Sequence, residues 1–302
     1  MLEQMNRDQT VVVIGAAGFI GGAVYRELIS QDFDVLGLDA RRSPIHTEIR
    51  QVDILDLESL TEQIPAGASV IHLAGPVAGS FSRGMASPWR LQVDGTSNVL
   101  HAAASKGCPN IVFGSSYHVY MASPPESKVD ENTDLPEKDL DAFGTSKLVS
   151  EHLARAFCRH AGMNLVTLRF GSVYGLGSCT NLMGDLFSAC SSDKEVEIWG
   201  AGKRTNHYVD LYDLAKGCAL ALTAQPGTYN VLDPHRYTIR DVCEVAEQTL
   251  GVRTTYRMDI PERPSFATIS ADRFMDATGW KPTSLTESFR RILPQIVAQR
   301  AA

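Results

Sequence analysis

The chain has 302 residues, of which 44% are hydrophobic and 21% charged, and 28 basic against 35 acidic residues give a formal charge of −7. This composition is that of a globular protein long enough for two domains, and it excludes collagen-like and low-complexity classes. The negative balance argues against a general nucleic-acid binder, which needs a stripe of Lys and Arg to neutralise phosphates.

Short apolar runs alternate with helical segments in the first part of the chain. The β-branched run Val11–Ile14 ends in a glycine turn, and the following stretch from Gly18 to Ser30 has apolar residues four apart, as on one helix face. The same patterns predict strands at Asp34–Asp39, Ser69–Gly75, Asn110–Ser116 and Asn164–Phe170, and helices at Trp89–Lys106 and Phe143–Ala161. This alternation predicts a parallel sheet covered on both faces, with ligands at the carboxyl ends of its strands.

The rhythm changes after residue 172, where a glycine-rich loop precedes a predicted helix at Leu182–Cys190 and a strand at Glu195–Trp199. We therefore expect an α/β fold. A Rossmann-type doubly wound parallel sheet would occupy residues 1–172, and a smaller C-terminal α/β lobe, interleaved with it, residues 173–302. Since no repeat or flexible linker separates the two parts, the substrate is expected in the cleft between them.

The compartment is predicted from what the chain lacks. Its apolar stretch Val11–Val24 is interrupted by four glycines and is shorter than the roughly 20 residues that a membrane-spanning helix needs. The polar N-terminus has no secretory layout, and the six cysteines form no C-x-x-C pair. We expect a cytoplasmic protein with reduced thiols, no metal site, and no membrane or nucleic-acid partner.

Three glycines mark a dinucleotide site. Gly15, Gly18 and Gly21 follow the first strand and open the first helix, where backbone N–H groups can approach a pyrophosphate. Glycines alone could simply shape a tight turn. Asp39, 18 residues after Gly21 at the end of the second strand, adds a carboxylate that can accept hydrogen bonds from an adenosine ribose.

The same carboxylate favours NAD over NADP, because it would repel a 2′-phosphate. Arg41 and Arg42 could serve NADP only if Asp39 turned away, and otherwise are solvated loop residues. Asp53 follows a third short strand and is placed to contact the adenine amino group; the alternative is an ordinary helix cap.

Taken together, the motifs resemble an extended short-chain dehydrogenase/reductase of the NAD-dependent epimerase/dehydratase family over nearly the whole length. The resemblance rests on segments around Gly15–Gly21, Asp39, Asp53, Val70–Gly75, Val93–Leu100, Phe113–Tyr120, Phe143–Lys147 and Leu168–Gly175. It implies a tightly held NAD and a sugar substrate, often one attached to a nucleoside diphosphate. It also implies cofactor contacts from Gly15, Gly18, Phe19, Ile20, Gly21, Asp39, Asp53, Ile54, Leu73, Ala74 and Lys147.

The catalytic segment departs from the family at one position. By the resemblance, Ser116 supplies the hydroxyl after the fifth strand and Lys147 the lysine, but Phe143 stands where the family has its proton-exchanging tyrosine. Phenylalanine exchanges no proton, and loss of a general base commonly costs on the order of 10² to 10⁴ in rate. Three explanations are open: an engineered variant that traps substrate, another proton-transfer group, or a non-catalytic NAD-binding relative.

Tyr117 and His118 are the candidates for another group. They resemble in position the Asp-Glu pair of sugar dehydratases, whose pattern is therefore not met here. A histidine can act as a general base or bind a substrate carboxylate, and packing at the strand end is an equally weighted interpretation. The short match of this segment and Ser172 to uronate dehydrogenases points to a free sugar acid.

The second half is closer to nucleotide-sugar enzymes. The resemblance assigns substrate contacts to Ser116, Ser172, Asn181, Arg204 and Arg263, the last as a phosphate-binding arginine. Asn206 replaces a family arginine and Ser172 a family asparagine, which indicates an unusual sugar. We predict a nucleotide-sugar 4-epimerase, and by analogy a homodimer that pairs through the helix at Phe143–Ala161. A sugar or uronate dehydrogenase, a dehydratase, a decarboxylase and a non-catalytic NAD sensor remain the alternatives.

Overall fold

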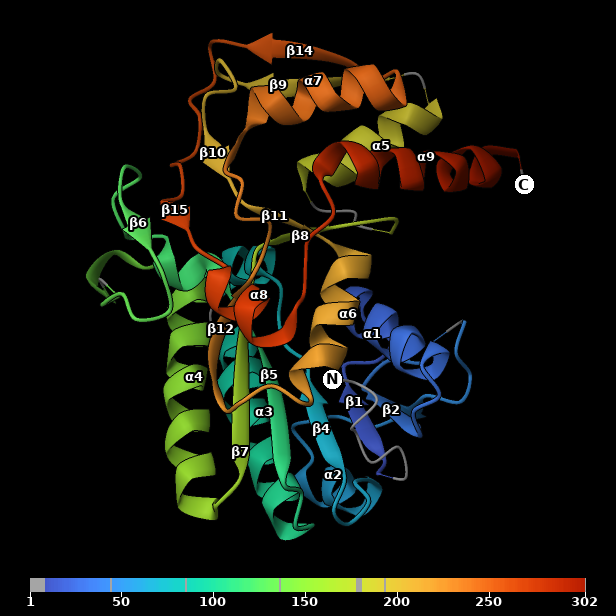
Figure 1. Ribbon diagram of the computed structural model, residues 1–302, viewed down its shortest axis with the longest axis vertical. Coiled ribbons are helices and arrows are strands. Elements are labelled where there is room, and N and C mark those ends of the chain that lie inside the picture. The colour runs from blue at the N-terminus through green and yellow to red at the C-terminus, as the bar shows by residue number, and fades with distance from the viewer. Residues whose placement is uncertain are drawn as a thin grey trace.

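The computed structural model describes residues 9–43, 45–84, 86–135, 137–177, 181–192 and 194–301. Figure 1 shows a body built around one sheet, with a narrower lobe above it. The sheet has seven parallel strands in the order β3-β2-β1-β4-β5-β7-β12. In that order they span Arg50–Gln51, Val35–Asp39, Val11–Ile14, Ser69–His72, Asn110–Ser116, Asn164–Phe170 and Gly227–Val231. The chain order reverses between β1 and β4, which is where sheets of this kind bind ligands.

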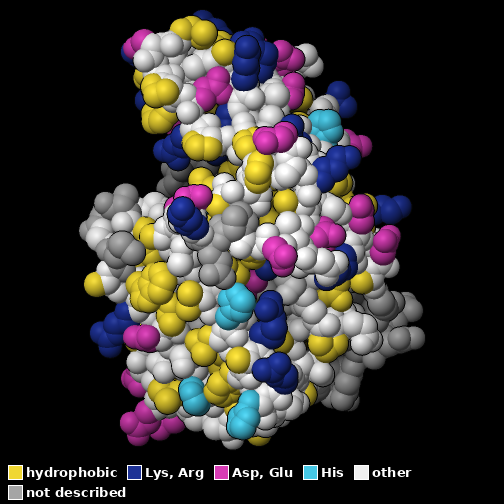
Figure 2. Space-filling view, turned by 90° about the vertical axis from the view of Figure 1, so that its left-hand side faces the viewer, with side chains coloured by type: hydrophobic (Ala, Val, Ile, Leu, Met, Phe, Trp, Pro, Cys, Tyr) yellow, Lys and Arg dark blue, Asp and Glu magenta, His cyan; other side chains and the backbone are white. Residues whose placement is uncertain are grey.

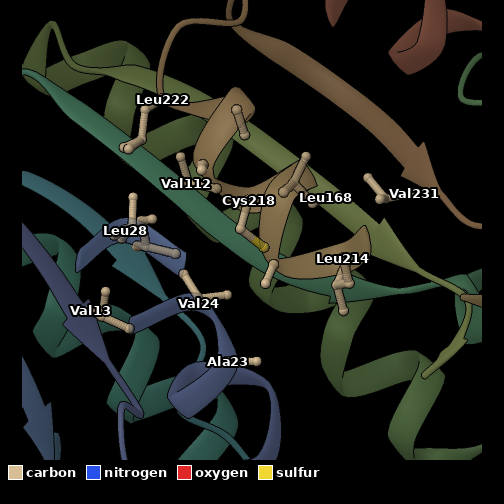
Figure 3. Packing of buried hydrophobic residues seen from close by; sticks show 14 of the residues in the cluster. Val13, Ala23, Val24, Leu28, Val112, Leu168, Leu214, Cys218, Leu222 and Val231 are labelled. Atoms are coloured by element: carbon tan, nitrogen blue, oxygen red, sulfur yellow. The ribbon is translucent and has the colours of Figure 1, made fainter. Parts of the chain in front are cut away.

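Helices cover both faces of the sheet. On one face lie α1 (Phe19–Ser30) and α6 (Leu211–Ala221), and on the other lie α2 (Leu57–Gln63), α3 (Ala86–Ser105) and α4 (Ala142–Ala161). Successive strand residues point to opposite faces, and in the central strands β1 and β4 every residue is buried, so these strands are covered on both sides. Figure 3 shows Val13, Val112 and Leu168 packed with Leu28 of α1 and Cys218 of α6.

The narrower lobe has its own core, formed where α5, α7 and α9 meet strands β9 and β14. Its centre includes Phe187, Val242 and Phe289, all buried. The second half of the chain also returns to the body, because α6 and β12 belong there. The elements beyond the sheet and its five helices are β6 (Lys128–Val129), β8 (Ser172–Tyr174), α5 (Leu182–Ser192), β9 (Glu195–Trp199), β10 (Thr205–Asn206), β11 (Tyr208–Asp210), β13 (Tyr237–Thr238), α7 (Ile239–Leu250), β14 (Arg253–Arg257), β15 (Thr268–Ile269), α8 (Asp272–Thr278), α9 (Leu285–Ala301) and the 3-10 helices η2 (Ala78–Arg83), η3 (Tyr117–Tyr120) and η4 (Glu137–Asp139).

The architecture confirms the predicted Rossmann-type α/β class. Each predicted strand and helix is present with bounds within three residues of those expected, since β-branched runs and four-residue spacing identify buried strands and helix faces. Among the described residues, no helix combines the length and apolarity needed to cross a membrane. On the face drawn in Figure 2, Lys and Arg side chains are interspersed with Asp and Glu. Cys108, Cys158, Cys218 and Cys243 are free, buried thiols, and Cys179 lies outside the described residues.

Candidate cofactor and catalytic site

The glycine loop between β1 and α1 is built for close backbone packing. Gly15 has φ +93°, a conformation that side chains disfavour, and a Cβ on Gly21 would lie 2.0 Å from the carbonyl oxygen of Gly15. Gly18, the residue before α1, offers no side chain to cap the helix. The first N–H groups of α1 are therefore left for a ligand, and a helix N-terminus favours an anion.

Asp39 ends β2 beside this loop, and its side chain is only 7% exposed. Its Oδ2 accepts a hydrogen bond from the N–H of Ala17 at 3.0 Å, and its Oδ1 accepts one from the N–H of Arg41 at 2.9 Å. The carboxylate is thus held against the glycine loop. Binding of NADP would require it to turn away. The Arg41 side chain is 70% exposed, with Nε 3.5 Å from Oδ1.

Replacing Asp39 with Ser is expected to raise the affinity for NADP relative to NAD at least tenfold, about 1.4 kcal/mol. The change removes a negative charge beside the 2′ position, and the nearby Arg41 guanidinium can then pair with phosphate. Calorimetric titration with both dinucleotides measures the ratio. Arg42→Ser is the matched control, since Arg42 contacts Gln51 instead. An unchanged ratio in Asp39→Ser would show that the carboxylate does not select the cofactor.

The other predicted cofactor residues surround the same strand ends. Asp53 is exposed and its Oδ1 accepts from the N–H of Leu55 at 2.9 Å. Asp56, not Asp53, caps α2, so the helix-cap alternative for Asp53 is wrong. The remaining five lie nearby: Phe19 and Ile20 open α1, Ile54 is buried after β3, and Leu73 and Ala74 follow β4 against Gly15.

Lys147 of α4 is buried and points back to the sheet, where Nζ donates a hydrogen bond to the carbonyl oxygen of Gly114 in β5 at 3.0 Å. An ammonium group has three N–H donors, so two remain for a ligand. A Cβ built on Gly75, after β4, would lie 3.6 Å from this Nζ. The lysine therefore stands beside the switch point of the sheet.

The sequence interpretation missed Gln92 of α3, which is fully buried. Its Nε2 donates to Thr96 Oγ1 at 3.4 Å and to Ser150 Oγ at 3.2 Å. Both hydroxyl groups donate their own hydrogen bonds to backbone carbonyl oxygens and therefore accept from Gln92. The amide orientation is thereby fixed. Within the described part of the chain its Oε1 has no hydrogen-bond partner, and it lies 2.9 Å from a Cβ built on Gly75. An orphaned buried acceptor beside Lys147 fits a polar ligand such as the nicotinamide half of NAD.

The ionisation of Lys147 makes stability depend on pH. Burial lowers the pKa of its ammonium group to about 8, although Glu151 opposes the shift. The unfolded chain, with an ordinary lysine pKa near 10.4, binds more protons between about pH 8 and 10, so folding gains stability as pH rises through that range. We expect wild type to gain on the order of 2 kcal/mol relative to Lys147→Met across that range, measured by urea unfolding without cofactor. A difference in the free energy of unfolding between wild type and Lys147→Met that stays constant over this pH range would contradict the prediction.

Ser116, Tyr117, His118 and Phe143 gather at the end of β5. Ser116 Oγ accepts a hydrogen bond from the N–H of His118 at 3.2 Å, which starts η3. The His118 and Phe143 rings make a T-shaped contact at 5.2 Å between centroids, and Lys147 Nζ lies 5.9 Å from the centroid of the same Phe143 ring. Phe143 is partly exposed, with Phe81 packed on it at 6.0 Å. The predicted catalytic residues thus lie together, around the Phe143 ring, which has no exchangeable proton.

The predicted substrate residues divide into two groups. Buried Tyr117 donates to Asn206 Oδ1 at 2.8 Å, and its pKa rises through burial while Arg204 and Ser172 nearby oppose the rise. The hydrogen bond between Tyr117 and Asn206 joins the segment that follows β5 in the body to β10. Arg263 instead is exposed and stacks over Trp199 at 5.6 Å from the ring centroid. Asn181 precedes α5, where its Oδ1 accepts from the N–H of Gly184 and its amide donates to Val173.

Comparison with known proteins assigns the chain to a family. It matches the model of the "NAD dependent epimerase/dehydratase family" over residues 11–231. It is 27% identical over 311 residues to a UDP-glucose 4-epimerase of Lactobacillus helveticus, covering 90% of this chain and 92% of the relative. It is also 27% identical over 282 residues to a dTDP-4-dehydro-6-deoxy-D-allose reductase of a Streptomyces species, covering 85% of each.

A solved structure agrees in fold. The UDP-glucose 4-epimerase of Thermotoga maritima with UDP-glucose superposes with a TM-score of 0.87 at 20% identity, covering 97% of this chain and 100% of that one. The family match covers well over half of the chain and carries the dependence on NAD with it, which confirms the predicted cofactor. The chain therefore belongs to the NAD-dependent epimerase/dehydratase family.

Proposed function

We propose that the protein is a nucleotide-sugar epimerase that inverts the hydroxyl-bearing C4 of its sugar. One observation carries the proposal: Ser116 ends β5, and Lys147 of α4 reaches the same strand beside the residues that pack on the glycine loop. UDP-glucose 4-epimerases among the relatives support the substrate class. An enzyme of this kind oxidises a carbon and reduces it again from the other face, so the cofactor is not consumed.

In this proposal the residues around the glycine loop bind the cofactor, and Ser116 and Lys147 act on the reacting carbon's oxygen. The α1 N-terminus would hold the pyrophosphate, Asp39 the adenosine ribose, and Lys147 with Gln92 the nicotinamide half. When bound, NAD supplies the acceptor and donor of the hydride. Ser116 Oγ would hydrogen-bond the reacting oxygen, and the Lys147 ammonium would stabilise negative charge that develops there.

Binding of the nucleoside diphosphate falls to the lobe in this proposal. Arg204 is partly buried beside Tyr117, and its Nε donates to the carbonyl oxygen of Pro264 at 3.1 Å. The neighbouring Arg263 is exposed, so a small rotation off Trp199 would bring a second guanidinium to a diphosphate. Asn206 is engaged by Tyr117, which supports an altered sugar contact at this position. The homodimer and the cytoplasmic location stay predictions.

The test is to incubate NAD-loaded protein with UDP-glucose, UDP-glucuronic acid and dTDP-glucose and to identify products by NMR. A C4 epimer formed without net NADH absorbance is the expected result. Net NADH would instead indicate a dehydrogenase, and release of carbon dioxide a decarboxylase. NAD binding without conversion of any probe, in both wild type and Phe143→Tyr, would favour the non-catalytic sensor and overturn the proposal.

A further inference from the structure

Two ionisable side chains flank Phe143. Lys147 is buried and donates one hydrogen bond to the carbonyl oxygen of Gly114. His118 is 19% exposed, and its ring lies nearly perpendicular to that of Phe143, with an interplanar angle of 83°. The two rings are 5.2 Å apart between centroids, so the imidazole lies beside the site of the missing phenol.

Asp141 orients this imidazole. Its Oδ2 lies 3.5 Å from Nδ1 of His118, while its Oδ1 accepts a hydrogen bond from the N–H of Gly144 at 2.6 Å and so caps α4. Burial raises the pKa of the Asp141 carboxyl, but the His118 side chain and the Gly144 N–H outweigh it, so the pKa stays below its usual value. The carboxylate is charged near neutral pH and favours a proton on Nδ1.

The rest of the imidazole is walled by aromatic rings. Tyr117 lies 5.2 Å and Phe266 5.5 Å from it, centroid to centroid. Among the described residues, Nδ1 is buried and has no neighbouring polar atom closer than Asp141 Oδ2 at 3.5 Å, which leaves the second ring nitrogen, Nε2, for a ligand. The backbone N–H of His118 is fixed on Ser116 Oγ, which ties the ring to the proposed oxygen-binding serine.

We propose that His118, oriented by Asp141, exchanges the hydroxyl proton of the sugar in place of a tyrosine. The inference rests on the proposed function. As the substrate carbon gives up its hydride to NAD, the O–H proton passes to Nε2 of His118 and the C–O bond becomes a carbonyl. When the hydride returns to the carbon, the imidazolium gives the proton back to oxygen. Asp141 acts as a positioning residue, because it touches only the imidazole.

The first test is His118→Gln with any probe that wild type converts. We expect kcat to fall on the order of 10²-fold or more, while the NAD affinity measured by calorimetry changes less than about twofold, because His118 is assigned no cofactor contact. His160→Gln, at the exposed end of α4, is the matched control and should keep wild-type activity. Adding Phe143→Tyr to His118→Gln should restore turnover by returning a phenol to the site.

Asp141→Asn gives a second readout that needs no turnover. Asn caps a helix as well as Asp, so α4 is kept, but the negative charge beside the ring is lost. The titrating and charged groups around His118 are Asp141, Tyr117 and, across Phe143, Lys147. Removing the carboxylate should reduce the share of neutral imidazole that carries its proton on Nδ1, which ¹⁵N chemical shifts report in cofactor-free protein, and should lower kcat more than it changes KM.

The outcomes separate the two proposals. Full activity in His118→Gln would overturn the role of His118 while the epimerase proposal stands. Activity in Phe143→Tyr but not in wild type would do the same, since it would show that the histidine cannot replace the phenol. An unchanged distribution of the imidazole proton between Nδ1 and Nε2 in Asp141→Asn would overturn the positioning role of Asp141. If wild type and Phe143→Tyr both convert no probe, the proposed function fails and this inference fails with it.

Discussion

Replacing Arg169 with Leu is expected to lower the free energy of unfolding by about 3–5 kcal/mol, the usual effect of stranding a buried charge. Arg169 of β7 and Glu151 of α4 form a bidentate pair, with Nε 3.0 Å from Oε1 and Nη2 2.7 Å from Oε2. Glu151 is fully buried and Arg169 is 4% exposed. The variant leaves the carboxylate without its counter-charge behind Ser116 and Lys147.

Urea unfolding of wild type and three variants tests this prediction. The double variant Glu151→Leu/Arg169→Leu removes both charges and should recover much of the loss. Ser115→Ala removes only the hydroxyl that donates to Glu151 Oε1, so it should cost about 1 kcal/mol. If Arg169→Leu is no less stable than the double variant, the unpaired Glu151 carboxylate carries no penalty and the prediction is wrong.

The body of the fold was predictable because its strands carry a strong local pattern. The run Val11–Ile14 is buried on both faces, so every residue is apolar and no helix periodicity competes. Gly15, Gly18 and Gly21 mark the turn because their Cβ positions are blocked by backbone. Asp39 was predictable as a binding residue for a related reason, since a carboxylate at the end of a buried strand needs hydrogen-bond donors.

The connections within the site were not predictable, because the side chains that meet there are far apart in the chain. Gln92 bonds Ser150 across 58 residues, and Tyr117 bonds Asn206 across 89. Neither pair leaves a periodic pattern, and each depends on how helices settle on the sheet. The wrong helix-cap alternative for Asp53 has a local cause: Asp56, three residues later, directly precedes the helix and takes the N–H of Ser59.

Asp141 illustrates a third kind of residue. The sequence shows an aspartate at the start of a predicted helix, which capping fully explains. In the structure one carboxylate oxygen caps α4 and the other lies beside the His118 imidazole. A local rule therefore accounted for the residue and concealed its second contact. Phe143, where the resemblance leads us to expect a tyrosine, gains a chemical context only when the contact between Asp141 and His118 is seen beside it.

Gly21→Ala is expected to weaken NAD binding at least a hundredfold, which corresponds to about 2.7 kcal/mol and to the loss of one or two hydrogen bonds to a charged group. The added Cβ would lie 2.0 Å from the carbonyl oxygen and 2.6 Å from the carbonyl carbon of Gly15, so the loop backbone must move. That shift misaligns the N–H groups that face the pyrophosphate.

The adjacent Gly22→Ala is the matched control. Its Cβ would approach the carbonyl oxygen of Ala16 at 3.3 Å, which a few tenths of an ångström of adjustment relieves, and alanine suits a helix interior better than glycine. Calorimetry should therefore find NAD affinity within about threefold of wild type in Gly22→Ala, and circular dichroism should find both variants folded. Wild-type affinity in a folded Gly21→Ala would place the pyrophosphate elsewhere, because a displaced loop cannot keep the N–H geometry that the anion requires.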